Sequence, residues 1–380
     1  MRRRFAFHQL LLLTVVLTLG GTALAGTTWH VDGAHGSDSN NCKSAAAACK
    51  TIGHAISLAS SGDAILVAAA VYSEHLTIPF SLAIVGANAQ TTIVDGGNSH
   101  TVVAIRTTSS TVSLSELTIR NGQALRGGGI SNAGTLTITN CTISGSTSTW
   151  SRFFAGGGLG GGIYNTGTLT LTRSTVSGNT AQSFHPQSLG GQGGGIYNTG
   201  SLVVTDSTIA WNVASGMWPG FASLGGGIAS PSGSVRVSNS TISVNSAQYS
   251  SPFGYGGYGG NLFGSINLEN SIVAYYYAGG NCSSGVSSNG HNLSDDSTCP
   301  FNKAGDMNNI DPLLGALRYN GGPTQTMALL PGSPAIDAGD PNGCKDNHGH
   351  LLETDQRGLP RPDKEDKTGC DMGPYERQTD

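Results

Sequence analysis

Residues 161–172 read Gly-Gly-Ile-Tyr-Asn-Thr-Gly-Thr-Leu-Thr-Leu-Thr, and residues 194–205 repeat them as Gly-Gly-Ile-Tyr-Asn-Thr-Gly-Ser-Leu-Val-Val-Thr. Related stretches begin at Gly128 and Gly226, and a fainter copy begins at Gly259. The repeats are anchored by residues at separations of 33, 33, 32 and 34 positions: Ile130, Ile163, Ile196, Ile228 and Leu262. A fixed period of this size is typical of a solenoid, in which each repeat packs mainly on its neighbours.

The pattern within one repeat predicts strands. Residues 169–172 alternate apolar and polar side chains, which is the period of a half-buried β-strand. The turn residues Asn165, Thr166 and Gly167 separate this run from the preceding one, and no stretch of the repeats has helical spacing. The repeats are therefore expected to be turns of a β-solenoid.

The charge distribution argues against a nucleic-acid partner. Only 11% of the residues are charged, 57 are glycine, and no lysine occurs between Lys50 and Lys303. A protein that binds a phosphate backbone needs a basic stripe or patch, which the repeats do not offer.

The N-terminus has the layout of a secretory signal, which we place at residues 1–25. Arginines at positions 2–4 precede the apolar run 10–19 and the small-residue site Ala23-Leu24-Ala25. No second apolar run of spanning length follows. We therefore expect a secreted protein, extracellular or on the cell surface, with no transmembrane segment in the mature chain.

The seven cysteines suit an oxidising compartment. Their spacing suggests three local disulfides, although sequence alone leaves the connectivity open: Cys42 with Cys49, Cys282 with Cys299, and Cys344 with Cys370. Cys141 is left over. It occupies a column that later repeats fill with serine, so we interpret it as a buried small side chain: Ser174, Ser207, Ser240 and Ser271.

The mature chain divides into three predicted regions. Residues 26–75 form an N-terminal cap and first strand, with a short amphipathic helix at about 50–60. Residues 76–281 form the solenoid, regular from about residue 127. Residues 282–380 form a C-terminal region whose last 44 residues hold 11 of the 23 acids, and we expect a hydrophilic, disulfide-tied cap there.

These regions resemble known families. The opening, from Trp29-His30-Val31-Asp32 to Tyr72-Ser73-Glu74, resembles the N-terminal cap of right-handed parallel β-helix proteins of the pectin-lyase-like superfamily. The Gly-Gly-x-Ile-x-Asn repeats resemble those of polymorphic outer-membrane-protein-type surface proteins. The end resembles the choice-of-anchor Q domain of secreted bacterial proteins, through Asp311-Pro312-Leu313-Leu314 and the run 330–340. The resemblance implies an all-β, right-handed parallel β-helix.

Each repeat is longer than a minimal coil of about 20 residues, so it carries an excursion of about 10–13 residues. The excursions span 146–160, 182–193, 215–224 and 246–258, and they should stack along one edge. They hold most of the aromatic side chains, Phe184 among them, which can stack on sugar rings or on another protein. The candidate contact residues are Trp150, Phe153, Phe154, Trp218, Phe221, Tyr249, Tyr255 and Tyr258.

We therefore expect a non-catalytic protein for adhesion, carbohydrate contact or envelope structure, whose partner is an extracellular polysaccharide or a cell-surface protein. The alternative is a polysaccharide lyase or glycoside hydrolase, which needs paired carboxylates or a cluster of Lys and Arg. The regular repeats lack lysine, and their two acids, Asp206 and Glu269, lie two coils apart. The candidates for that alternative are Glu74, Asp95, His100, Arg106, Glu116 and Asp206.

The sequence predicts no cofactor and no metal site. Asp337 with Asp340, and the loop residues Asp346, His348, His350 and Glu353, could hold a cation, but we favour a hydrophilic cap there.

Overall fold

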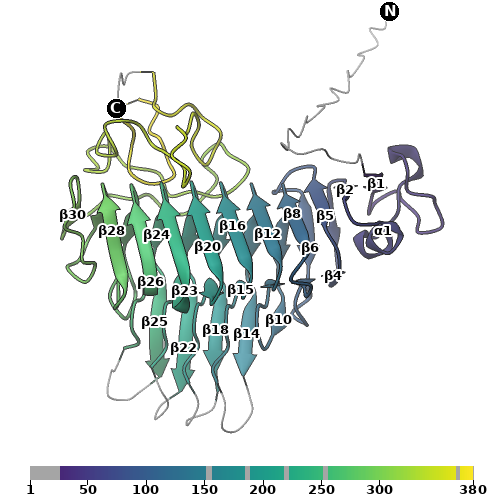
Figure 1. Cartoon of the computed structure of the whole chain (residues 1–380), viewed down its shortest axis with the longest axis horizontal. Helices are drawn as coiled ribbons and strands as arrows, with labels where there is room; N and C mark the ends of the chain where they lie inside the picture. Colours follow the sequence, from purple (N-terminus) through teal and green to yellow (C-terminus); the bar gives the residue numbers. More distant parts are fainter. Residues whose placement is uncertain are drawn as a thin grey trace, which may run out of the picture.

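The computed structural model describes residues 26–150, 156–184, 189–217, 222–250, 256–364 and 369–379, without the side chains of residues 150, 249 and 250. Nearly all regular structure is β, and the strands stack in parallel as the predicted β-helix (Figure 1). Each regular coil turns three corners, so the stack is a prism with three faces. Within the described residues, no helix has the length and apolar character needed to cross a membrane.

The first and second faces belong to one 15-stranded sheet, because the long strand β23 (Ile228–Ser238) turns the corner between them. The first face contains β1 (Thr28–Val31), β2 (Asp63–Val67), β5 (Leu82–Gly86), β8 (Thr111–Ser115), β12 (Thr135–Thr139), β16 (Thr168–Thr172) and β20 (Ser201–Thr205), and it continues through β26 (Leu262–Glu269) to β28 (Val286–Gly290). The second face contains β4 (Leu76–Ile78), β7 (Val103–Ile105), β11 (Ile130–Asn132), β15 (Ile163–Asn165) and β19 (Ile196–Asn198).

The third face is a sheet of ten strands within the described residues. It contains β3 (Ala70–Tyr72), β6 (Thr92–Asp95), β9 (Thr118–Arg120), β13 (Thr142–Ser144), β17 (Thr175–Ser177), β21 (Thr208–Ala210), β24 (Thr241–Ser243), β27 (Ile272–Ala274), β29 (Leu293–Ser294) and β30 (Met307–Asn308). Parallel pairing thus continues past residue 281, the predicted end of the solenoid, to Asn308.

The core is built from the repeated aliphatic positions. Ile163 pairs with Ile130 on one side and with Ile196 on the other, and Ile196 pairs with Ile228. All four side chains are fully buried. Burying one such side chain stabilises the fold by about 1.5–3 kcal/mol before entropy costs, so the repeat period directly creates the core.

Polar ladders fix the corners between coils. Asn212 Nδ2 donates to Asn245 Oδ1 at 2.9 Å, and Asn245 Nδ2 donates to Asn261 Oδ1 at 2.8 Å. At another corner the predicted serine column is present, and Cys141 begins it as a buried free thiol whose backbone N–H donates to Ser174 Oγ at 3.1 Å. Cys141 is fully buried, which confirms the prediction of a buried small side chain. This burial raises the pKa of its thiol to about 12.

The corner of the Asn212 ladder also requires glycine, because a Cβ on Gly195 would lie 3.0 Å from Asn212 Nδ2. Gly160 and Gly193 both have φ of +64°. A Cβ on Gly160 would lie 2.1 Å from the carbonyl oxygen of Ile163. This close approach explains why a glycine precedes each Gly-Gly-Ile motif.

The N-terminal cap forms as predicted. The 3-10 turn η1 (Ala45–Ala47) lies between the bonded Cys42 and Cys49, and helix α1 (Ile52–Leu58) packs on β1, β2 and β4. The Oγ1 atom of Thr51 accepts from His54 N at 3.2 Å and caps the helix. The helix therefore lies at the predicted position beside the first coils.

The C-terminal segment, residues 309–364 and 369–379, folds back along the side of the stack (Figure 1, yellow). Gln356 Nε2 donates to Thr175 Oγ1 at 3.1 Å, and Thr208 Oγ1 donates to Gln356 Oε1 at 2.7 Å. The other two disulfides also join the predicted pairs, Cys282–Cys299 and Cys344–Cys370. The segment thus covers the flank of several coils.

A buried ionic network joins this segment to the coils. Arg361 Nη1 lies 2.7 Å from Asp206 Oδ1, and Arg361 Nε lies 2.7 Å from Glu376 Oε2. Burial raises the pKa of Asp206 to about 7, against the opposing charge of Arg361. Burial also raises the pKa of Asp371 to about 7, and the negative charge of Glu376 acts in the same direction.

The excursions form a fin, defined here as strands β10 (Gln123–Ala124), β14 (Thr147–Trp150), β18 (Thr180–Ser183), β22 (Val213–Met217) and β25 (Ser246–Ser250), with the return segments 156–160, 189–193, 222–225 and 256–259. Figure 1 shows β14, β18, β22 and β25 beside one another below the prism. The return segments pair in parallel through Leu159, Gln192, Leu224 and Tyr258. The excursions therefore stack along one edge, as predicted.

The two layers of the fin lie very close together. Ala181, Ala214 and Ala247 of the strand layer are fully buried. A Cβ on Gly191 would lie 1.9 Å from the carbonyl oxygen of Ala181, and one on Gly257 would lie 2.9 Å from the Cβ of Ala247. Small side chains and glycine are therefore needed between the layers.

Replacing Arg361 with Met should lower the free energy of unfolding by about 3–5 kcal/mol, because Asp206 and Glu376 would remain buried without their counter-charge. Urea unfolding at pH 8 measures this. The exposed Arg106→Met serves as the matched control and should change the value by about 0.5 kcal/mol or less. Equal stability of the two variants would contradict the assigned role of the network.

The pKa of Asp371 predicts a pH dependence. The folded protein holds this proton up to about pH 7, whereas an unfolded aspartate loses it near pH 4. The contribution of Asp371 to the free energy of unfolding should therefore fall as pH rises from about 4 to 7. Urea unfolding of wild type and Asp371→Asn should show a difference that declines over this range and then levels off.

Asp311→Asn is the control for that experiment. The hydrogen bond from Tyr275 lowers the pKa of Asp311, so its difference from wild type should stay constant above about pH 4. A constant difference for Asp371→Asn as well would contradict the raised pKa.

Gly257→Ala should destabilise the fin by about 1–3 kcal/mol, because the added methyl group overlaps backbone atoms. Gly256→Ala is the control, since the nearest atom to its Cβ lies at 3.6 Å. Thermal unfolding should separate these neighbouring variants by several degrees. Indistinguishable melting temperatures would mean that the layers can move apart at little cost.

Candidate functional site

The outward surface of the strand layer carries a column of polar side chains. Thr149, Gln182, Ser215 and Gln248 occupy matched positions on β14, β18, β22 and β25. Alternation along each strand places them opposite the buried alanines. Gln182 Nε2 donates to Thr149 Oγ1 at 3.1 Å. The coil register thus spaces these groups by about 4.8 Å from one strand to the next.

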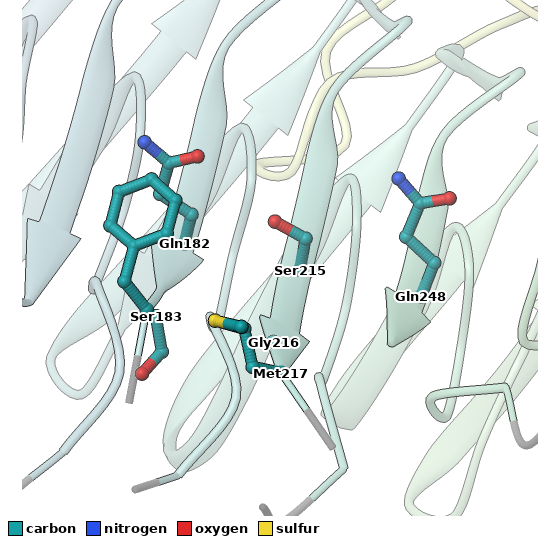
Figure 2. Close-up of a pocket in the computed structure, with 7 residues that line it drawn as sticks. Gln182, Ser183, Ser215, Gly216, Met217 and Gln248 are labelled. Atoms are coloured by element: carbon teal, nitrogen blue, oxygen red, sulfur yellow. The ribbon is translucent and has the colours of Figure 1, made fainter. Parts of the chain in front are cut away.

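A cavity of about 510 Å³ lies over this column. Figure 2 shows the side chains of Gln182 and Gln248 on the same side of the sheet, with Ser215 between them. Phe184 and Met217 also line the cavity and are 55% and 41% exposed. The cavity therefore combines neutral hydrogen-bonding groups with exposed apolar surface.

This chemistry suits binding. An amide can both donate to and accept from a hydroxyl group, and Phe184 can contact an apolar face of a ligand. None of the seven residues that line the cavity has an ionisable side chain. General acid–base catalysis requires such groups, so these residues can hold a ligand but offer no proton transfer.

Most of the aromatic contacts predicted from sequence fall on undescribed positions. Trp150 and Tyr249 lie on β14 and β25, but their side chains are outside the description. Tyr258 is described: it is 58% exposed and lies on the return layer, paired with Leu224. The remaining predicted residues lie outside the described residues: Phe153, Phe154, Trp218, Phe221 and Tyr255.

Sequence reasoning missed the polar column. Residues 180–182 and 246–248 read Thr-Ala-Gln and Ser-Ala-Gln at a spacing of two repeats, and this period was a usable signal. It also missed Tyr276 and Tyr277, which are 41% and 79% exposed. They precede Ala278, which pairs with Ser246 on the last fin strand, but no repeat marks them.

The acids proposed for the enzyme alternative have local partners. Glu74 accepts from the N–H groups of Ile52 at 2.9 Å and Gly53 at 2.7 Å at the start of α1. Asp95 Oδ2 lies 2.7 Å from Arg120 Nε. Glu116 Oε1 accepts from Asn140 Nδ2 at 2.6 Å. Each therefore stabilises a different part of the fold.

The other three residues proposed for the enzyme alternative also have different surroundings. His100 contacts His75 edge-on at 5.3 Å between ring centroids. Arg106 is exposed, and Asp206 is buried in the ionic network with Arg361. None of the six residues lines the cavity over the polar column.

Potential metal ligands come close together near the N-terminal cap. Within the described chain, the single group of three close donors is Cys42, Cys49 and His54. The two sulfur atoms are bonded to each other, so they are not available as thiolates. In the C-terminal loop, Asp346 Oδ1 accepts from the backbone N–H groups of His348 and His350. This loop uses its acid to fix its own turn.

No family model and no curated protein matches the sequence. Among solved structures, the fold is similar to that of pectate lyase Pel9A, at 15% identity and a TM-score of 0.45, over 94% of this chain and 98% of that one. It is similar to a rhamnogalacturonan lyase at 12% identity and a TM-score of 0.46, over 81% and 96%. XylC, solved with xylose, has 12% identity and a TM-score of 0.30, over 91% and 98%. These likenesses concern the fold alone, and the strand pairing establishes the parallel β-helix.

Proposed function

We propose that the protein is a non-catalytic, secreted or cell-surface β-helix that binds a neutral stretch of extracellular polysaccharide on the fin. The observation that carries this proposal is the cavity of about 510 Å³ whose described lining includes Gln182, Ser215, Gln248 and Phe184 and holds no ionisable side chain. The amide groups of Gln182 and Gln248 and the hydroxyl group of Ser215 lie on adjacent strands, so they can form hydrogen bonds with successive sugar hydroxyl groups. Phe184 supplies the stacking surface.

The secreted state rests on three observations. The N-terminal residues 1–25 have the pattern of a secretory signal. Three disulfides are formed, which is typical of an oxidising compartment. The resemblance of residues 282–380 to a choice-of-anchor Q domain supports the same location. We propose that domain assignment for residues 282–380.

The aromatic side chains predicted for the excursions belong to the same proposal. Phe184 shows that one excursion places an aromatic ring beside the polar column. We propose that the excursion aromatics, among them Trp150 and Trp218, also contact the sugar chain.

Binding of purified neutral polysaccharides, measured by affinity electrophoresis and glycan array, tests the proposal. Gln182→Ala/Gln248→Ala should weaken binding about tenfold, because each lost hydrogen bond contributes about 0.5–1.5 kcal/mol. Phe184→Ala should weaken it to a similar extent. Gln123→Ala is the matched control, because this glutamine lies on the first fin strand, away from the cavity.

Two results would overturn the proposal. Polysaccharide binding that is unchanged in the double variant and in Phe184→Ala would remove the fin cavity as the site. Release of shortened or unsaturated products from pectin, alginate or glucans by the wild type would instead establish the lyase or hydrolase alternative.

A further inference from the structure

A second cavity, of about 170 Å³, lies between the first face of the prism and the C-terminal segment. Its floor includes Arg236 on β23 and Glu269 on β26. Its wall is the loop 345–349. Pockets for drug-sized ligands occupy about 300–1,000 Å³, so this cavity fits one small molecule.

The wall is held in place before any ligand arrives. Cys344, next to the loop, is bonded to Cys370. Asn347 Nδ2 donates to Thr205 Oγ1 at 2.9 Å, and Asn239 Nδ2 donates to the carbonyl oxygen of Lys345 at 2.7 Å. These contacts fix the loop to two different coils, so the cavity is preformed.

Two of the four charges in the cavity are already engaged by the C-terminal segment. Lys345 Nζ lies 3.5 Å from Asp340 Oδ2. Asp346 accepts hydrogen bonds from the backbone of its own loop and lies 3.2 Å from His350 Nδ1. Neither charge is left without a partner.

The other two charges, Arg236 and Glu269, face the cavity from the sheet. Among the described residues, neither side chain has a hydrogen-bond or ion-pair partner. Arg236 pairs in register with Asn267, and Glu269 lies two residues beyond Asn267. One strand step of about 4.8 Å and two residues of about 3.3 Å each separate their backbone positions, so one small ligand can reach both.

We propose that this cavity binds a free α-amino acid, with its carboxylate on the guanidinium of Arg236 and its ammonium group on the carboxylate of Glu269. Charge complementarity selects this class. A ligand with a carboxylate alone would meet the like charge of Glu269, and an amine alone would meet that of Arg236. An α-amino acid carries both charges on one carbon atom and matches the pair.

Calorimetric titration with three matched probes tests the assignment: L-alanine, N-acetyl-L-alanine, which keeps only the carboxylate, and L-alaninamide, which keeps only the ammonium group. Alanine should bind at least tenfold more tightly than either analogue, because charge-assisted hydrogen bonds are the strong ones. Arg236→Gln should remove the preference over alaninamide. Glu269→Gln should remove the preference over N-acetylalanine.

Arg106→Gln is the control, because it removes an exposed positive charge away from the cavity and should leave alanine binding unchanged. Thermal unfolding and polysaccharide binding at the fin, measured on the same variants, should equal the wild type, so a failure here is distinguishable from a failure of the proposed function. The proposal is wrong if folded wild type shows no saturable alanine binding, if either analogue binds as tightly, or if both cavity variants keep the wild-type preferences.

Discussion

The register between successive coils is the constraint on which the rest of this structure depends. Backbone hydrogen bonds alone would tolerate a shift of strands, because every residue offers the same donor and acceptor. Side chains remove that freedom. A shift at Asn212 would break its bond to Asn245 inside the prism, and a buried amide without a partner costs about 1–3 kcal/mol. The buried isoleucines and the asparagine ladder therefore require the same register.

This register also produces the candidate binding surface. The same register that pairs Ile163 with Ile196 also pairs Gln182 with Ser215, and Ser215 with Gln248. A polar column of uniform spacing is thus a consequence of core packing. The glycines between the fin layers have a related effect, because they keep the strand layer close to the return layer and its outward side chains in one row.

The sequence predicts local and periodic features well and distant contacts poorly. The repeat fold, helix α1, the buried Cys141 and the three disulfides follow from spacing within or between neighbouring repeats, and the structure confirms them. The contact of Asp206 with Arg361 joins residues 155 positions apart. No period relates the C-terminal segment to the coils, so its position on their flank could not be read from the pattern.

The C-terminal segment brings additional charged side chains close to the repeats. The regular repeats lack lysine, and their acids are isolated when only the repeats are considered. In the folded chain, Lys345 and Asp346 lie beside Arg236 and Glu269 in one small cavity, while the larger cavity on the fin is lined by neutral groups. The described lining of the fin cavity therefore comes from the repeats alone and is neutral, whereas the charged cavity is built by the first face of the prism together with the C-terminal segment.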